Sequence, residues 1–311
     1  MQQQPAQSTT PTGDARFFVV VNRAAGGGRC GKLADGTLAR LRAAGVDFAA
    51  ADSEHPGHGT KLVRRAYRDG FRRFVAMGGD GTSYEIVNGL FPEALGSHVT
   101  LAFQPLGTGN SFLRDFSSEG LPYATRALLA GRERACDVLR LRHRDGELHY
   151  INLLSLGFTA DVAALTNRRF KRFGYPGYLL GIFACLARLR RRPFPLRVDD
   201  DEELDRRRHL FLTFNNSKFT GGTMMIAPNA ETASGEVEYV RWGPVGRIAL
   251  LRSLHTLYDG THLDHPLASR RGIRNVQFAL DEPVDIMVDG EVLTVHPETL
   301  DVLPGALHVM V

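Results

Sequence analysis

A short glycine-rich segment, Gly78-Gly79-Asp80-Gly81-Thr82, contains the residues best suited to chemistry. It follows Phe74–Met77, an apolar run typical of a buried parallel strand. Thr82, with Glu85 three residues later, predicts the capped start of a helix. A glycine turn between a strand and a helix lets an anion such as a phosphate reach the backbone amides. A carboxylate at Asp80 would then need a partner, either Mg²⁺ held with a nucleotide phosphate or a hydroxyl that must lose its proton.

Two further glycine turns follow strands in the same way. Gly107-Thr108-Gly109-Asn110 comes soon after the apolar run Val99–Phe103, and the turn Asn22–Arg29 follows Phe17–Val21. The carboxyl ends of parallel strands meet at one edge of a sheet, where α/β proteins bind ligands. A single turn of this kind would be an ordinary strand-to-helix connection, but the combination predicts a phosphate site. The turn that ends at Arg29 matches neither a Walker loop nor a dinucleotide fingerprint.

These turns require a parallel sheet to position them. The alternation of strands and helices in the first part of the chain predicts an open parallel sheet, so we expect a nucleotide-binding α/β domain at 15–134. From 135 to 301 shorter alternating strands predict an antiparallel β-rich domain of the sandwich type. The strands expected there are Asp137–Arg142, His149–Leu156, Leu196–Val198, His209–Asn215, Gly235–Trp242, Asn275–Leu280 and Pro283–Val288.

The composition bounds the class of protein. At 311 residues the chain has room for two domains, and its net charge of +4 is modest. Three well-separated cysteines indicate reduced thiols and a cytoplasmic location, and no Cys/His spacing suggests zinc. No apolar stretch reaches the ~20 residues that a membrane span needs. Residues 1–14 lack the features of a signal peptide, and we expect them to form a disordered tail.

A basic helical insertion is predicted at 162–193. Residues 162–198 contain nine Lys or Arg and no Asp or Glu, with an apolar helix expected between two basic clusters. This pattern fits a helix packed on the β domain with solvated ends, or contact with an anionic membrane surface. Alternatively, arginines such as Arg172 could clamp ATP phosphates. We expect no nucleic-acid partner, because no binding module or stacking pattern of aromatic residues is present.

The glycine turns and several later segments together resemble a known family. The chain is similar to the catalytic domain of diacylglycerol and sphingosine kinases over nearly its whole length after residue 15. The resemblance implies a two-domain kinase that binds ATP between its domains, holds a lipid in the β domain and returns residues 302–311 to the first domain. The matching segments are Asn22…Gly26-Gly27-Gly28-Arg29, Gly78–Thr82…Glu85…Asn88-Gly89, Pro105–Asn110, Ser155–Val162, Asn216…Thr220-Gly221-Gly222…Ile226-Ala227-Pro228 and Val288-Asp289-Gly290-Glu291.

The resemblance also implies roles for individual residues. It places ATP against the three glycine turns and a loop containing Ser53 and His58, and it implies Mg²⁺-dependent transfer of the γ-phosphoryl group to a lipid hydroxyl. The catalytic carboxylates would be Asp80 and the pair Asp289 and Glu291. The ATP-binding set would be Asn22, Gly26, Gly28, Arg29, Ser53, His58, Gly78, Gly79, Gly81, Thr82, Glu85, Gly107, Thr108, Gly109, Asn110 and, from the basic insertion, Arg172.

Several choices stay open at this level. We favour Asp289 as the base and Asp80 as the magnesium ligand, although in some relatives the residue matching Asp80 is the proposed base, and Asp289-Gly290 also fits a type I′ hairpin turn. Asp161 matches a residue that contacts the lipid head group in sphingosine kinases, but it could equally cap a helix beginning at Val162. Ser111 stands where an aspartate is usual, which weakens the assignment to diacylglycerol.

The acceptor and the partners are the remaining expectations. A diacylglycerol, a sphingoid base and a ceramide all fit as acceptors, and NAD kinase or a non-catalytic nucleotide or lipid sensor are the alternative functions. Ser234 replaces a carboxylate that holds a structural Mg²⁺ in bacterial relatives, so we do not expect that metal. We expect a cytoplasmic protein, peripheral at the inner membrane face, that could form a homodimer.

Overall fold

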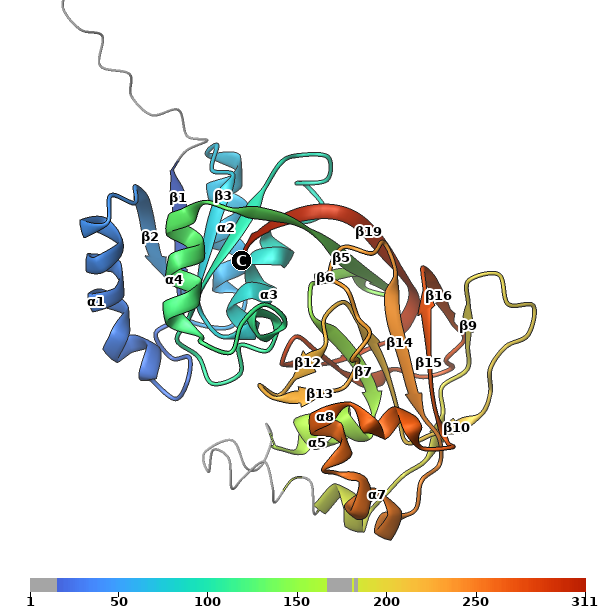
Figure 1. The fold of residues 1–311 in the computed structure, drawn as a ribbon. Coiled ribbons are helices and arrows are strands. Elements are labelled where there is room, and N and C mark those ends of the chain that lie inside the picture. The colour runs from blue at the N-terminus through green and yellow to red at the C-terminus, as the bar shows by residue number, and fades with distance from the viewer. Residues whose placement is uncertain (1–15, 167–180, 182–183) are drawn as a thin grey trace, which may run out of the picture.

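The computed structural model describes residues 16–166, 181 and 184–311, and these residues form two domains (Figure 1). An α/β domain with a parallel sheet is followed by an antiparallel β sandwich, which confirms the predicted fold class. Arg172 and part of the basic insertion lie outside the described residues.

The first domain alternates strands and helices around one parallel sheet. Its strands lie in the order β2-β1-β3-β4, all parallel, and are buried because helices cover both faces. Val20 packs on one face with α2 and α3, whereas its neighbours Val19 and Val21 pack on the other face with α1. The elements are β1 (Phe17–Val21), α1 (Arg29–Ala43), β2 (Phe48–Asp52), α2 (His58–Arg68), β3 (Arg73–Gly78), α3 (Asp80–Leu90), β4 (Thr100–Pro105), η1 (Phe112–Asp115) and α4 (Leu121–Ala130).

The second domain is a sandwich with helices on its outer side. One sheet has the order β15-β14-β11-β7-β17-β18, and the facing strands are β5, β6, β9, β16 and part of β19. Leu154 and Phe214 of the first sheet pack against Leu139 and Leu300 of the facing strands. The other face of the first sheet is covered by α5, α7 and α8 around Trp242, which is fully buried.

The bounds of these elements follow in chain order. The strands that open the domain are β5 (Glu133–His143), β6 (Gly146–Tyr150) and β7 (Leu153–Gly157), followed by α5 (Phe158–Leu165). The middle of the domain contains β8 (Arg192–Pro193), β9 (Leu196–Val198), β10 (Arg208–His209), β11 (Phe211–Asn215), β12 (Phe219–Thr220), β13 (Met224–Met225) and β14 (Val237–Trp242). The last part contains α7 (Arg247–Ser253), α8 (Thr256–Asp259), η4 (Thr261–Asp264), β15 (Ala268–Ile273), β16 (Asn275–Phe278), β17 (Val284–Val288), β18 (Glu291–Val295) and β19 (Pro297–Met310).

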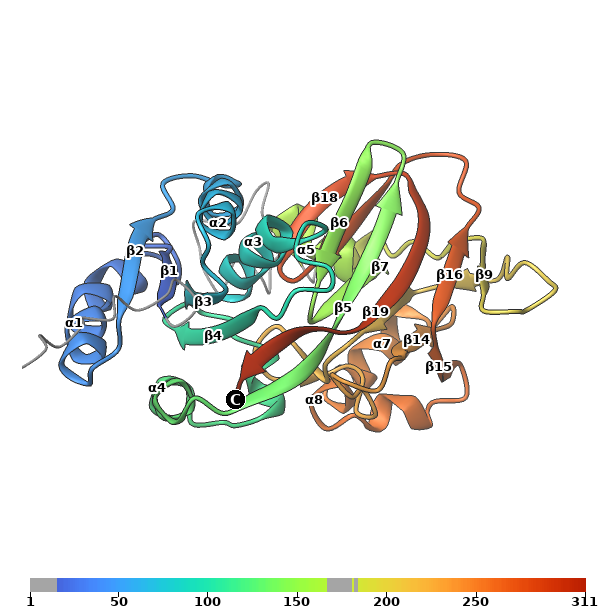
Figure 2. The same cartoon turned by 90° about the horizontal axis from the view of Figure 1, so that it is seen from above.

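Strand β19 belongs to both domains. His308 and Val309 pair in parallel with Thr100 and Leu101 of β4, whereas the rest of the strand pairs antiparallel with β5 and β16. Figure 2 shows β5 and β19 running side by side from one domain to the other. The buried carboxylate of Asp137 accepts the N–H of Gly305 in β19 and that of Gly235, each at 2.7 Å, and so holds the connection in place.

Asn88 joins α3 to the second domain. Its side-chain amide donates to the carbonyls of Tyr84 and His149, both at 2.8 Å, and its side-chain oxygen accepts the N–H of His149 at 2.9 Å. The side chain of Asn88, in the first domain, therefore satisfies both the N–H and the carbonyl of His149 in β6. This contact, together with β19, sets where α3 lies relative to the sandwich.

Three local predictions were wrong. Helix α3 begins at Asp80 with Gly79 as its N-cap, so Thr82 lies inside the first turn and caps nothing. The expected strand His149–Leu156 is two strands, because the chain crosses from one sheet to the other between Tyr150 and Leu153. Helix α5 begins at Phe158 with Gly157 as its N-cap, so Asp161 does not cap it.

No helix among the described residues is long and apolar enough to cross a bilayer.

Candidate active site

The three glycine turns pack directly against one another. The N–H of Gly107 donates to the carbonyl of Gly78 at 2.7 Å, and a Cβ added at Gly107 would lie 2.6 Å from the Cα of Gly79. A Cβ at Gly26 would lie 3.0 Å from the carbonyl oxygen of Leu106. Side chains at these positions would force the turns apart, so the sequence needs glycine here to bring three strand ends together.

One side of the three packed glycine turns is open to solvent. Gly27 and Gly28 have φ of +63° and +89°, and a Cβ at either would meet nothing within 4 Å. Arg29 is exposed at the first position of α1, where a cation is not stabilised by the helix and can pair with an anion. Thr108 is exposed in the third turn. The turn amides and Arg29 together form a surface suited to phosphate groups.

Other predicted ATP-binding residues pack against the backbone of the glycine turns. Thr82 is buried and lies against Gly78, so its hydroxyl fills the space that a side chain at Gly78 would take. Asn110 has a φ of +41°, and its side-chain amide donates to the carbonyl of Gly107 at 3.1 Å. The Cβ of Asn22 lies 3.4 Å from the Cβ position of Gly78. These side chains position the backbone of the turns.

Asp80 lies half-buried at the start of α3. Its Oδ2 atom accepts the N–H of Ser111 at 2.9 Å and lies 3.0 Å from the Cβ position of Gly109. Burial raises the pKa of Asp80 to about 6, while the hydrogen bonds from Ser111 lower it. A hollow of about 10 Å³ lies between Gly78, Asp80 and Phe112. It is too small for a phosphate, so a nucleotide would lie on the open surface of the turns.

Asp289 lies in a two-residue hairpin turn between β17 and β18. Asp289 and Gly290 have φ of +45° and +89°, as a type I′ turn requires. The carboxylate is buried and accepts the N–H groups of Ile151, Asn152 and Leu153 at 2.9–3.2 Å. It therefore binds the chain where β6 ends and β7 begins. Burial raises the pKa of Asp289 to about 7, although the three N–H groups favour its ionised form.

Glu291 connects the hairpin to the first domain. Its Oε1 atom lies 2.7 Å from the Cβ position of Gly81, so Glu291 reaches the turn that carries Asp80. The charge of Asp80 contributes to the raised pKa of Asp289. After burial, the charges of Asp289 and Glu291 contribute most to the raised pKa of Tyr84 on α3. The structure thus brings the three predicted catalytic carboxylates together from two domains.

Glu85 lies with Ser53 and His58 at the N-terminus of α2. Its carboxylate accepts the N–H groups of Gly57 at 2.6 Å and Gly59 at 2.7 Å, and the hydroxyl of Ser53 donates to it at 3.5 Å. The ring of His58 accepts the N–H of Glu54 at 3.2 Å. Glu85 supplies the negative charge that the start of α2 lacks in its own sequence. The carboxylate of Glu85 is therefore hydrogen-bonded within the protein, and it holds the loop before α2 beside α3.

Asp161 forms an ion pair on α5. Its Oδ1 atom accepts a hydrogen bond from the guanidinium of Arg192 at 2.6 Å, and Arg192 lies over the ring of Phe194. The charge of Asp161 is therefore compensated within the chain.

Two bridging residues were not predicted from the sequence. The hydroxyl of Ser111 accepts the N–H of Gly222 at 2.9 Å, and the carboxylate of Asp115 accepts the N–H of Lys218 at 3.0 and 3.1 Å. Burial raises the pKa of Asp115 to about 6. Both link the third glycine turn region to the β12–β13 segment of the second domain. In the sequence Ser111 stood out only as a replacement of the usual aspartate, and Asp115 had no signal beyond its position in the 3₁₀ helix after the turn.

Ser234 occupies the loop where bacterial relatives were expected to hold a metal. Its hydroxyl lies 3.2 Å from the carbonyl oxygen of Glu231 and accepts the N–H of Glu236 at 3.2 Å. The loop is also tied to Asp137 through the N–H of Gly235. Hydrogen bonds within the protein close this loop.

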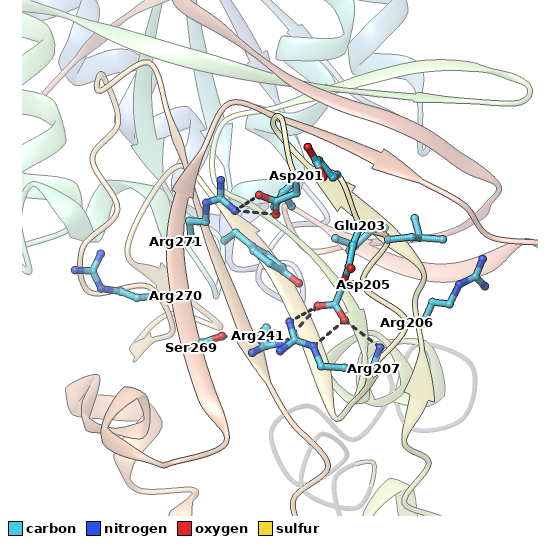
Figure 3. A pocket seen from close by; sticks show the side chains of 14 residues that line it. Asp201, Glu203, Asp205, Arg206, Arg207, Arg241, Ser269, Arg270 and Arg271 are labelled. Carbon is cyan, nitrogen blue, oxygen red and sulfur yellow. Dashed lines mark hydrogen bonds and ion pairs between the residues drawn. The ribbon is translucent and has the colours of Figure 1, made fainter.

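A larger cavity of about 860 Å³ lies far from the glycine turns, between residues 201–207 and strands β14 and β15 (Figure 3). Its charged side chains are mostly paired: Arg271 binds Asp201 at 2.8 and 2.9 Å, and both Arg207 and Arg241 bind Asp205. All lining residues come from the second domain. The glycine turns contribute nothing to this cavity, so it is not the predicted nucleotide site.

Comparisons with known proteins agree with this geometry. The family model described as the diacylglycerol kinase catalytic domain matches residues 16–141, and the model described as the YegS C-terminal NAD kinase beta sandwich-like domain matches residues 152–311. A diacylglycerol kinase of Mycobacterium tuberculosis is 28% identical over 301 residues, which cover 95% of this chain and 94% of the relative. A protein of Chromohalobacter salexigens named "Probable lipid kinase YegS-like" is 30% identical over 87% of this chain and 86% of its own length.

A solved structure shows the same fold. The crystal structure of a diacylglycerol kinase from Bacillus anthracis superposes with a TM-score of 0.69 at 19% identity, covering 95% of this chain and 96% of that one. The two family matches follow one another along the chain and together span both domains. This chain therefore belongs to the lipid kinase family that joins a diacylglycerol kinase catalytic domain to a YegS-type β sandwich.

Proposed function

We propose that the protein transfers the γ-phosphoryl group of ATP, with Mg²⁺, to a hydroxyl of a membrane lipid. The observation that carries the proposal is the approach of the Asp289–Glu291 hairpin to the glycine turn of Asp80, shown by the contact of Glu291 with Gly81. Phosphoryl transfer depends mainly on positioning and on charge stabilisation. A site that offers backbone amides from one domain and, from the other, the buried carboxylate of Asp289 and the exposed carboxylate of Glu291 meets both needs.

The residues present fit ATP and Mg²⁺. The glycine turns offer backbone amides around Gly27 and Gly28 without side chains above them, and Arg29 adds a cation. The described residues contain no cluster of three protein ligands that could hold a metal alone. Mg²⁺ bound with a nucleotide needs only one or two carboxylates, because phosphates and water complete its shell. Asp80 would hold the ion, which neutralises the charge that develops on the phosphates.

Asp289 is the residue that we assign to proton transfer. It would take the proton of the acceptor hydroxyl as the hydroxyl oxygen bonds to the γ-phosphorus and the bond to ADP breaks. Its buried position raises its pKa toward neutrality, which suits a general base. Glu291, at the same hairpin and against Gly81, would keep the turn aligned with the phosphate site.

The acceptor that the site fits best is uncharged. A sphingoid base carries an ammonium group, and the residue that could read it is Asp161, which is already paired with Arg192 at 2.6 Å. An ammonium would have to replace a guanidinium that fits the carboxylate well. A diacylglycerol or a ceramide offers a hydroxyl without charge and makes no such demand. We therefore propose diacylglycerol or a similar neutral lipid as the acceptor.

The proposal is tested by offering purified protein a panel of acceptors with radiolabelled ATP and Mg²⁺. We expect transfer to diacylglycerol in mixed micelles, at least about tenfold weaker transfer to a sphingoid base, and none to NAD. Transfer to NAD would instead establish an NAD kinase. ATP binding without transfer to any lipid of the panel would favour a sensor and overturn the proposal.

The pH dependence follows from Asp289. A base must be ionised, so kcat/KM should rise with pH through about 7, the pKa to which burial raises Asp289. Because Asp80 and Asp289 interact, the midpoint belongs to the pair. A folded-state pKa above the ordinary carboxyl value of ~3.9 also means that this group's contribution to stability decreases as pH rises from about 4 to about 7. Activity profiles and thermal unfolding across this range check both trends, and a flat activity profile would contradict the assignment.

A further inference from the structure

Helices α7 and α8 form one continuous helical surface. Leu254 and His255, which lie between them, have helical backbone angles, with φ of −61° and −67°. One side of this segment is buried in the core beneath the sandwich, where Leu250 and Leu257 pack around Trp242. Figure 1 shows α7 at the end of the second domain that lies away from the α/β domain, and α8 beside β13. The fold thus needs only one side of these helices for packing.

The other side of the same helices is apolar as well. Ile248, Leu251 and Tyr258 are 67%, 44% and 52% exposed. Among the large apolar side chains that are exposed in the described part of the chain, Ile248 and Leu251 are the two closest together in the sequence. The spacing 248, 251, 255 and 258 follows one face of a helix, with exposed His255 between the apolar residues. Apolar side chains exposed along one face of a helix in this way are typical of an interaction site.

The surroundings of this apolar face are basic. Arg247 donates to the carbonyls of Leu186 and Ala187, both at 3.1 Å, and so holds the basic run Arg188–Arg192 beside the start of α7. Arg252 is exposed next to Leu251. Residues 184–198 and 243–259 contain seven arginines and one acidic residue, the exposed Asp259 at the end of α8. Apolar side chains within a field of arginine are typical of segments that lie in the interface of an anionic bilayer.

We propose that this surface, Ile248, Leu251 and Tyr258 with Arg188, Arg190 and Arg252, docks the enzyme on an anionic membrane. The charge decides between the two simplest occupants. A second copy of the chain would place arginine against arginine across a two-fold axis, whereas a layer of anionic lipid complements both the charge and the apolar side chains. The inference rests on the proposed function in one respect, since a lipid acceptor is reached from a bilayer.

Binding of the full chain to vesicles tests the proposal without catalysis. The protein should sediment with vesicles of phosphatidylcholine and phosphatidylglycerol, bind vesicles of phosphatidylcholine alone much more weakly, and be released by salt. The double variant Ile248→Asn/Leu251→Asn should lower vesicle binding about tenfold or more. Arg188→Gln/Arg190→Gln/Arg252→Gln should lower binding to the anionic vesicles by at least about tenfold and leave binding to neutral vesicles unchanged.

The matched control changes exposed leucines elsewhere. Leu33 on α1 and Leu129 on α4 are 38% and 48% exposed, and Leu33→Asn/Leu129→Asn should bind vesicles like the unchanged protein. Equal vesicle binding by the α7 variant and the control would overturn the proposal, as would a change of the α7 variant from dimer to monomer in sedimentation velocity without loss of vesicle binding. Transfer to a short-chain, water-soluble diacylglycerol tests the proposed function separately, and we expect all of these variants to retain it.

Discussion

Replacing Asp289 with Asn is expected to lower kcat for lipid phosphorylation by roughly 10²–10⁴-fold, the usual loss on removing a general base. Binding of ATP should change little, because Asp289 belongs to the hairpin of the second domain, whereas the proposed phosphate surface is formed by the glycine turns of the first. Turnover with diacylglycerol and equilibrium binding of a fluorescent ATP analogue measure the two quantities on the same preparation.

The effect of Asp289→Asn on turnover must also be distinguished from an effect on folding stability. Oδ1 of Asp289 accepts the N–H groups of Asn152 and Leu153, which an asparagine oxygen could still accept. Oδ2 accepts the N–H of Ile151, and an amide nitrogen there would face another donor. Leaving this buried N–H without an acceptor should cost about 1–3 kcal/mol of stability. Thermal unfolding should therefore show a moderate decrease in Tm with a single cooperative transition.

Asp137 provides a matched control for this cost. It is also a buried carboxylate, and it accepts one backbone N–H on each oxygen, from Gly305 and Gly235. Asp137→Asn should therefore decrease Tm by a similar amount while keeping most of the turnover. If the two variants lost turnover equally, Asp289 would be a structural residue of the hairpin and the assignment of the base would be wrong.

Asp80→Asn tests whether Asp80, rather than Asp289, is the residue that binds Mg²⁺. Because Asp80 is assigned to Mg²⁺, its loss should raise the Mg²⁺ concentration needed for half-maximal activity, whereas Asp289→Asn should not. A loss of turnover without any change in the Mg²⁺ requirement would exchange the two roles.

The sequence predicted those parts of the candidate site whose backbone conformation depends on neighbouring residues in the chain. Glycines after apolar strands predicted the positions of the three turns, since close backbone contact such as that of Gly107 with Gly79 leaves no room for a side chain. Asp289-Gly290 was readable as a hairpin turn because type I′ turns require positive φ at both positions. The proposed role of its carboxylate came from the family resemblance and not from local pattern.

The remaining features depend on contacts between distant segments. The break between β6 and β7 is marked in the sequence by Asn152 alone, and Asp289, far along the chain, stabilises it by accepting the N–H groups of 151–153. Glu85 read as a capping partner of its own helix but caps α2 instead. The helices around Ile248 were missed because apolar residues lie on both of their sides, which removes the amphipathic period on which prediction relies.

Gly107→Ala is expected to impair the nucleotide site through backbone contact alone. The added Cβ would lie 2.6 Å from Cα and 2.7 Å from N of Gly79 and 3.1 Å from C of Gly78. None of these atoms belongs to a flexible side chain, so the second and third turns would have to move apart. Overpacking of this kind costs about 1–3 kcal/mol. It would also break or stretch the 2.7 Å hydrogen bond from Gly107 to Gly78, which sets the spacing of the turns.

Because these turns form the proposed phosphate surface, affinity for ATP should fall by roughly tenfold or more, equivalent to at least about 1.4 kcal/mol. Calorimetric titration with ATP and Mg²⁺ measures this directly. Gly36→Ala is the matched control, since Gly36 lies within α1 and a Cβ there meets nothing within 4 Å. That change should raise stability by about 0.5–1 kcal/mol and leave ATP binding unaltered. If Gly107→Ala bound ATP as tightly as Gly36→Ala, close contact between the turns would not be required for the site, and ATP would have to bind elsewhere.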